Sequence, residues 1–172
     1  MTTAMGAGID IFIHPGEWFF GDGETRIWTT LGSSVSVTLW HPRLKVGGLC
    51  HYMLPGERHH EAALNPRYGH DAVTLLMAEV QSHCTEAGDY EAKLFGGASM
   101  FDLGPGGCSV ARQNVEAAEH LVIQHGLNVV ARSLGGTRYR QLVFNLVNGD
   151  VWVRQGGSDD QDRAHRQIGG AA

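Results

Sequence analysis

The chain has 172 residues, of which 42% are apolar, and a formal net charge of -5. This length suits a single domain with a substantial core, because a chain of this size buries roughly 70% of the surface that its unfolded form exposes. The acidic balance and the absence of any cluster of Lys and Arg argue against nucleic acid as a partner.

The sequence also argues against membrane insertion. No apolar stretch approaches the roughly 20 residues that a membrane-spanning helix needs. The first five residues lack the basic and then apolar layout of a secretory signal. We therefore expect a cytoplasmic protein.

The first predicted elements are two strands, residues 35–40 and 46–53, whose composition favours β structure. Pro42 lies between them, and its fixed φ and missing amide hydrogen suit a turn. The two strands are therefore predicted to form a hairpin.

Two helices are predicted from apolar residues that recur at the three- and four-residue spacing of one helix face. The first covers residues 71–87 and ends before Gly88, where a C-terminal cap belongs. Its apolar stripe consists of Val73, Leu76, Met77, Val80 and Cys84. The second covers residues 111–125 and ends before Gly126.

The remaining strands are short and lie in the second half of the chain. They are predicted over residues 94–96, 127–131, 141–147 and 150–154. Asn148 and Gly149 separate the last two and favour a two-residue hairpin turn. Because helices and strands do not alternate strictly, we predict an α+β fold with one domain over residues 1–156. The polar segment 157–172 is predicted to be a disordered tail.

Ser34 and His51 are the first candidates for chemistry. If Trp40 and Val46 pair across the first hairpin, counting back brings Ser34 within one residue of lying opposite His51, where side chains approach to about 5 Å. A nucleophile beside an imidazole base is the minimum equipment for acyl transfer, and the preceding Gly-Ser turn could offer backbone amides to an oxyanion. The alternative is that Ser34 is a strand-edge hydroxyl and His51 a structural histidine.

The cysteines and the other histidines suggest less. Cysteine occurs three times, without Cys-x-x-Cys spacing, so neither a disulfide framework nor a zinc site is indicated. We interpret all three as buried or neutral thiols: Cys50, Cys84 and Cys108. Four residues could gather around a metal with His51: His59, His60, Glu61 and His70. They follow Pro55-Gly56 without helical spacing, so we interpret them as an exposed loop and expect no metal.

Residues 31–37, Leu-Gly-Ser-Ser-Val-Ser-Val, resemble the Leu-Gly-Ser-Cys-Val-Ala-Val signature of CheD, the family of chemoreceptor glutamine deamidases. His51, in Gly-Gly-Leu-Cys-His-Tyr-Met-Leu-Pro, resembles the catalytic histidine of that family. Further matching segments follow in the same order, at residues 95–101, 114–115, 135–136 and 144–145. The resemblance runs from Gly8 to Arg154.

The resemblance implies a fold of mixed β-sheets in a sandwich-like core flanked by helices, similar to CheD and to the cytotoxic necrotizing factor deamidases. It implies hydrolysis of glutamine side-chain amides to glutamate and, in some members, of glutamyl methyl esters, with no metal or organic cofactor. The implied partners are a methyl-accepting chemotaxis receptor and the phosphatase CheC.

The resemblance also implies three catalytic positions. Ser34 stands at the nucleophile position and His51 at the base position. The third is a threonine shortly before the nucleophile, for which Thr29 and Thr30 are the candidates, although the next position outward is Trp28. We choose Thr29, with an ordinary strand threonine as the alternative.

Ser34 departs from the family pattern, in which this residue is cysteine. A hydroxyl is far less acidic than a thiol, so a single histidine does not readily ionise it. Three interpretations follow: an engineered Cys-to-Ser form that traps or silences the enzyme, a natural non-catalytic paralogue, or a genuine Ser-His hydrolase. The alternative function is a binding module that recognises receptor helices or a CheC-like partner without catalysis.

Overall fold

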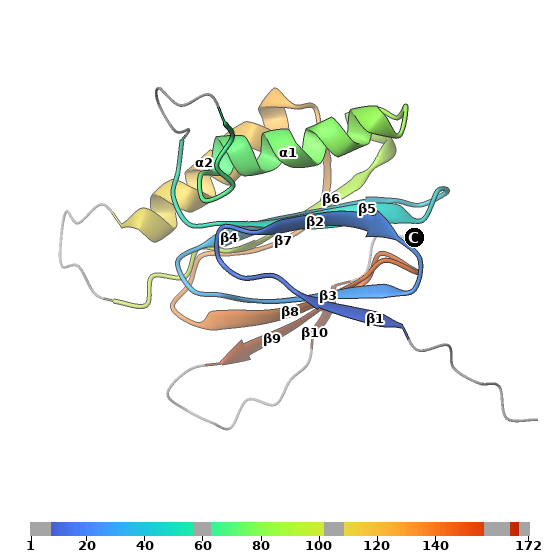
Figure 1. Ribbon diagram of the computed structural model, residues 1–172. Coiled ribbons are helices and arrows are strands. Elements are labelled where there is room, and N and C mark those ends of the chain that lie inside the picture. Colours follow the sequence, from blue (N-terminus) through green and yellow to red (C-terminus); the bar gives the residue numbers. More distant parts are fainter. Residues whose placement is uncertain (1–7, 57–62, 102–108, 157–165, 169–172) are drawn as a thin grey trace, which may run out of the picture.

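The computed structural model describes residues 8–56, 63–101, 109–156 and 166–168. Within them, two α-helices lie on one face of a five-stranded sheet, and a second five-stranded sheet packs beneath the first (Figure 1). The predicted α+β fold with a sandwich-like core is confirmed.

The sheet next to the helices, here called the upper sheet, has the order β2-β5-β4-β6-β7. Its strands are β2 (Trp18–Asp22), β4 (Val35–His41), β5 (Val46–Tyr52), β6 (Glu91–Gly96) and β7 (Asn128–Leu134). The predicted hairpin is present as β4 and β5, but Trp40 pairs with Gly47 rather than with Val46. The register therefore differs by one residue from the one assumed above.

The second sheet, here called the lower sheet, has the order β1-β3-β8-β9-β10. Its strands are β1 (Ile9–Phe12), β3 (Thr25–Leu31), β8 (Tyr139–Asn145), β9 (Val151–Gly156) and β10 (Arg166–Ile168). The strands β1, β2 and β3 were not predicted from the sequence. Part of the tail expected to be disordered pairs with β9 as β10, whereas residues 157–165 and 169–172 lie outside the described residues.

The turn between β8 and β9 is longer than the predicted two-residue turn. Asn145 donates its backbone N–H to the carbonyl of Asp150, and Gly149 donates to the carbonyl of Asn145. Four residues therefore lie between Asn145 and Asp150, and Asn148 caps the loop by accepting from the Asp150 amide.

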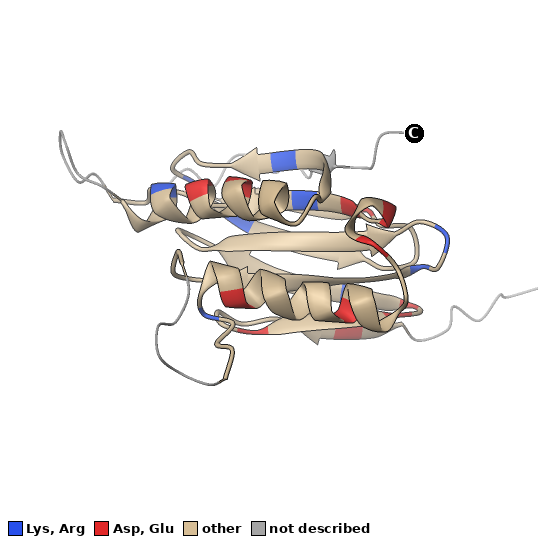
Figure 2. Ribbon diagram, turned by 90° about the horizontal axis from the view of Figure 1, so that it is seen from above, with Lys and Arg blue, Asp and Glu red and all other residues tan. Residues whose placement is uncertain are grey.

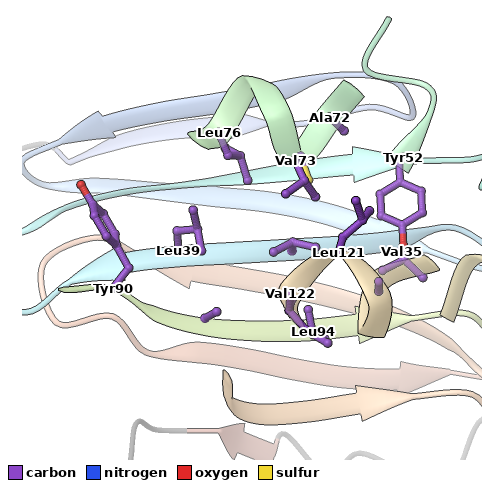
Figure 3. Packing of buried hydrophobic residues seen from close by; sticks show 14 of the residues in the cluster. Val35, Leu39, Tyr52, Ala72, Val73, Leu76, Tyr90, Leu94, Leu121 and Val122 are labelled. Carbon is purple, nitrogen blue, oxygen red and sulfur yellow. The ribbon is translucent and has the colours of Figure 1, made fainter. Parts of the chain in front are cut away.

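Two hydrophobic cores separate the three layers. The upper core lies between the helices and the upper sheet, where Val35, Leu39 and Leu94 meet Val73 and Leu121 (Figure 3). The lower core lies between the two sheets and includes Ile27, Leu49, Phe95, Leu142 and Phe144. Because side chains alternate across a strand, each strand of the upper sheet can face both cores.

The helices are α1 (Gly69–Ser82) and α2 (Val110–Gln124). The end of α2 is as predicted, with Gly126 at a φ of 68°. The end of α1 is not, because Cys84 takes a φ of 55° and leaves the helix. Cys84 is exposed rather than part of the apolar stripe, and Gly88 belongs to the short 3-10 helix η1 (Ala87–Asp89) instead of capping α1.

Seen from above the helices, acidic and basic residues are interspersed along the described helices and strands (Figure 2). Neither α1 nor α2 is long and apolar enough to cross a membrane, and no other helix among the described residues is either.

Candidate active site

His51 lies between two hydroxyl groups. Its Nε2 is 2.8 Å from Oγ of Ser34, and its Nδ1 is 2.8 Å from Oγ1 of Thr29. Both distances are those of hydrogen bonds. The structure therefore brings together all three residues that the sequence analysis selected.

The alternation of buried and exposed side chains along β3 distinguishes Thr29 from Thr30 and Trp28. Thr29 is buried and faces the lower core, as do Ile27 and Leu31 on the same strand. Thr30 and Trp28 face the opposite side, where both are exposed. Only Thr29 of these candidates reaches His51, and it does so from the other sheet.

The hydrogen bonds of Thr29 determine which nitrogen of His51 carries the proton. A threonine hydroxyl has one proton, and Thr29 donates it to the backbone carbonyl of Ile13 at 2.7 Å. The hydroxyl oxygen must then accept from Nδ1–H of His51. This arrangement leaves the lone pair of Nε2 directed at the Ser34 hydroxyl, which is the tautomer that a general base requires.

Burial keeps the imidazole neutral. His51 is 1% exposed, and desolvation lowers its pKa from the ordinary value of 6.5 to about 4. The ring is therefore unprotonated at neutral pH and able to accept a proton. Ser34, in contrast, is half-buried just before β4 and follows the exposed Ser33, so that side of the pair is nearer to solvent.

Ser34 immediately precedes β4, and its position relative to His51 is diagonal. The residue paired directly with His51 across the hairpin is Ser36, two residues further along. The hydroxyl of Ser36 is buried and has no hydrogen-bond partner among the described residues. Ser34 therefore reaches Nε2 from the end of its strand, where the chain is not yet enclosed by the sheet.

The Gly96-Gly97 segment holds the turn that carries Ser34. The amide of Gly97 donates to the Ser34 carbonyl at 2.8 Å, and the amide of Ala98 donates to the Gly32 carbonyl at 2.9 Å. A Cβ atom on Gly96 would collide with the Ser34 carbonyl oxygen, and Gly96 has a φ of 112°. Only glycine fits there, which explains why this motif belongs to the site.

Two further residues reach the site without having been given a role from sequence. The carbonyl of Ile13 orients Thr29, and Asn114 of α2 contacts the backbone beside both Ser34 and His51. Asn114 was noted as part of a matching segment, but no local pattern shows that a helix would deliver it to this turn.

Those of the remaining sequence candidates that the structure describes lie elsewhere. Cys50 is next to His51 in the chain but points into the upper core, where burial raises the pKa of its thiol to about 12. Cys108 and the segment containing His59, His60 and Glu61 lie outside the described residues. His70 lies on α1 against Asp71, and no group of three potential metal ligands occurs in the described part of the chain.

A pocket of about 180 Å³ lies beside the turn that carries Ser34. Its walls are Ser33, residues 98–101, and residues 109–111 at the beginning of α2. Met100, Phe101 and Val110 are all exposed at its rim, Phe101 by 81%. The candidate site therefore combines a polar centre with an apolar surface next to it.

Comparison with known proteins identifies relatives that match most of the chain. It is 42% identical to a Chromobacterium violaceum protein named "Probable chemoreceptor glutamine deamidase CheD 1", over 92% of this chain and 83% of that protein. It is also 42% identical to the "Probable chemoreceptor glutamine deamidase CheD 3" of Dechloromonas aromatica, over 96% and 99% of the two chains. A third relative, from Pseudomonas savastanoi pv. phaseolicola, is 41% identical over 90% and 88%.

A family model described as CheD chemotactic sensory transduction matches residues 53–155. This match contains the Gly96-Gly97 segment and Asn114, and it covers more than half of the chain. Together with these relatives, it shows that the chain belongs to the CheD family.

Proposed function

We propose that the chain has the architecture of a chemoreceptor glutamine deamidase, with residue 34 as nucleophile, His51 as base and Thr29 as the residue that orients His51. With Ser34 at the nucleophile position, we propose that this form is inactive or weakly active. The observation that carries the proposal is the continuous chain of hydrogen bonds from Ile13 through Thr29 and His51 to Ser34.

The proposed reaction begins with attack of residue 34 on the carboxamide carbon of a receptor glutamine, while Nε2 of His51 takes the nucleophile's proton. The C–N bond then breaks, and His51 gives that proton to the leaving nitrogen, which departs as ammonia. Water attacks the acyl intermediate and gives a proton to His51. The bond to residue 34 breaks, residue 34 recovers the proton, and glutamate is released.

Serine at this position is expected to slow the reaction, and the surroundings of His51 give the reason. Its lowered pKa makes it a weak base, and the Ser34 hydroxyl is a weak acid. Serine hydrolases offset this mismatch with a carboxylate that stabilises the imidazolium. Here the partner of Nδ1 is the uncharged Thr29 hydroxyl, so we expect little stabilisation of a charged His51.

A thiol would relieve the mismatch. Cysteine and histidine can exchange a proton before substrate arrives, and the resulting pair of opposite charges stabilises itself. We therefore attribute the expected low activity to the side-chain oxygen of Ser34, in place of sulfur, and not to the rest of the site.

The proposed substrate is a cytoplasmic helix of a methyl-accepting chemotaxis receptor, which implies a cytoplasmic location for this chain. The pocket beside Ser33 is smaller than the about 300–1,000 Å³ typical of small-molecule sites, as expected where one protruding side chain is received. The exposed Met100, Phe101 and Val110 offer apolar contacts to the helix around it.

The proposal is tested by incubating the Ser34→Cys variant with a receptor cytoplasmic fragment. Mass spectrometry then follows the small mass gain that accompanies each amide converted to acid. We expect conversion at specific glutamines and none when heat-denatured variant is added. A receptor fragment that remains unmodified at high enzyme concentration would contradict the proposal.

A second candidate function is a non-catalytic module that binds receptor helices or a CheC-like phosphatase. Serine at position 34 favours it, because the rest of the site is intact without an ionisable nucleophile. The two functions are separated by Ser34→Cys: a binding module gains no deamidase activity, whereas a silenced enzyme does.

A further inference from the structure

We propose that Asn114 is a positioning residue, which locks the turn carrying residue 34 to the strand carrying His51. This inference rests on the proposed function. The Nδ2 group of Asn114 donates to the carbonyl of Ser33 at 3.0 Å and to the carbonyl of Met53 at 2.9 Å. One side chain therefore connects the residue before the nucleophile with the end of β5, two residues after the base.

The amide of Asn114 can serve this purpose in one orientation only. Its two N–H protons are both used, one for each carbonyl. A flipped amide would direct Oδ1 at two carbonyl oxygens and lose both bonds. Because the peptide unit is planar, holding the Ser33 carbonyl also determines the direction of the Ser34 amide.

The backbone of Asn114 is held as firmly as its side chain. Its carbonyl accepts a hydrogen bond from the hydroxyl of Tyr52 at 2.6 Å, and Tyr52 follows His51 directly. The neighbouring Val115 packs against Gly97, whose amide holds the Ser34 carbonyl. One turn of α2 thus contacts the residues flanking both members of the proposed pair.

The burial of Asn114 argues against a role in helix stability alone. The residue is fully buried, and its Oδ1 has no hydrogen-bond partner among the described residues. An unpaired acceptor in a buried position is destabilising, and asparagine in the middle of a helix is a weak helix former. An apolar residue would suit this helix position better, so the two carbonyl contacts are what asparagine contributes.

The experiment uses the full chain with Ser34→Cys and compares Asn114→Leu with Val122→Ala. Leucine has a similar size but no donor. Val122 is a buried residue of the same helix, further toward its C-terminal end, and its truncation shows what a loss of stability alone does to the site; urea unfolding measures the stability of each variant. Asn114→Ala, which removes both donors and adds no volume, replaces Asn114→Leu if the latter does not fold.

Two quantities are measured in each variant. The first is the pH dependence of alkylation by iodoacetamide of the thiol introduced at position 34, resolved from the other cysteines by peptide mass spectrometry. The second is kcat and KM for deamidation of a receptor fragment. We expect Asn114→Leu to move the alkylation midpoint toward that of an ordinary thiol and to lower kcat about tenfold or more with KM little changed. Val122→Ala is expected to change neither.

The inference is overturned if Asn114→Leu keeps both the alkylation midpoint and kcat of its parent, or if Val122→Ala reproduces the changes. The two proposals fail in different ways. A shifted midpoint in a chain that never deamidates the receptor fragment supports the role of Asn114 and contradicts the proposed function. An active parent with an equally active Asn114→Leu variant supports the proposed function and contradicts the role of Asn114.

Discussion

The hydroxyl of Thr29 lies 2.8 Å from Nδ1 of His51 although the two residues belong to different sheets. Thr29 faces the lower core from β3, and His51 faces it from β5. The packing of one sheet on the other therefore sets the orientation of the imidazole. Loss of this contact would leave the ring in place but would no longer determine which of its nitrogens carries the proton.

We expect Thr29→Val in the Ser34→Cys chain to lower the deamidation rate about tenfold, the equivalent of one lost hydrogen bond. Valine keeps the shape of the side chain and removes its hydroxyl. Thr29→Ser keeps the hydroxyl and should retain most of the rate. Equal rates for the valine variant and its parent would show that Thr29 does not orient His51.

The stability of the Ser34 chain should depend on pH through His51. Its pKa is about 4 in the folded chain and about 6.5 in the unfolded chain, so the unfolded chain takes up the proton first as pH falls. The contribution of neutral His51 to the free energy of unfolding is complete above pH about 6.5 and decreases as the pH falls toward 4. Below pH 4 it no longer changes, and the total decrease is about 3 kcal/mol. Urea unfolding at several pH values measures it.

The control for this pH dependence is His51→Gln, because other groups also titrate in the same range. The free energy of unfolding of His51→Gln should decrease less between pH 7 and pH 4 than that of the parent. Parallel curves for the two proteins would mean that His51 is not held neutral by burial.

Gly96→Ala should be more harmful than an alanine at another glycine of positive φ. The new Cβ would meet the Ser34 carbonyl oxygen, whereas at Gly126, with a φ of 68°, a Cβ has open space. We expect Gly126→Ala to cost about 1 kcal/mol and Gly96→Ala about 1–3 kcal/mol more. Similar unfolding midpoints for both variants would refute this close approach.

Binding should survive the serine at position 34, because the apolar rim around Met100 and Val110 does not depend on the nucleophile. Titration of a labelled receptor fragment should give similar affinities for the Ser34 chain and for Ser34→Cys. Binding by Ser34→Cys alone would show that the serine form has lost its surface as well as its chemistry.

Much of the fold follows from local patterns. The strands β4 and β5 and the end of α2 were predicted because composition, Pro42 and Gly126 act over a few residues. The strand β3 was missed although its signal is present: Thr25, Ile27, Thr29 and Leu31 alternate with exposed residues. This alternation would have favoured Thr29 over Thr30 without reference to any family.

The errors occur where the backbone leaves a regular element. The apolar spacing continues to Cys84, but the backbone there takes a positive φ, which spacing does not reveal. The register of the first hairpin differs by one residue because the turn has four residues and places Lys45 at a φ of 56°. That shift makes Ser36, and not Val35, the direct partner of His51, so Ser34 lies two residues from that position instead of one.

The site itself depends on contacts between distant segments. Counting along one hairpin allowed Ser34 and His51 to meet, and the resemblance to CheD selected them. The contacts of Thr29 with Ile13 and of Asn114 with Ser33 join separate layers of the fold, so no local pattern predicts them.

The pairing of residue 34 with His51 is tested most directly by comparing three chains on one receptor fragment by mass spectrometry: the Ser34 chain, Ser34→Cys, and Ser34→Cys with His51→Ala. We predict that Ser34→Cys deamidates the fragment, that the Ser34 chain converts little or none, and that His51→Ala lowers the rate of Ser34→Cys about 100-fold or more. Equal rates for the Ser34 chain and Ser34→Cys, or full activity without His51, would contradict the proposed pair.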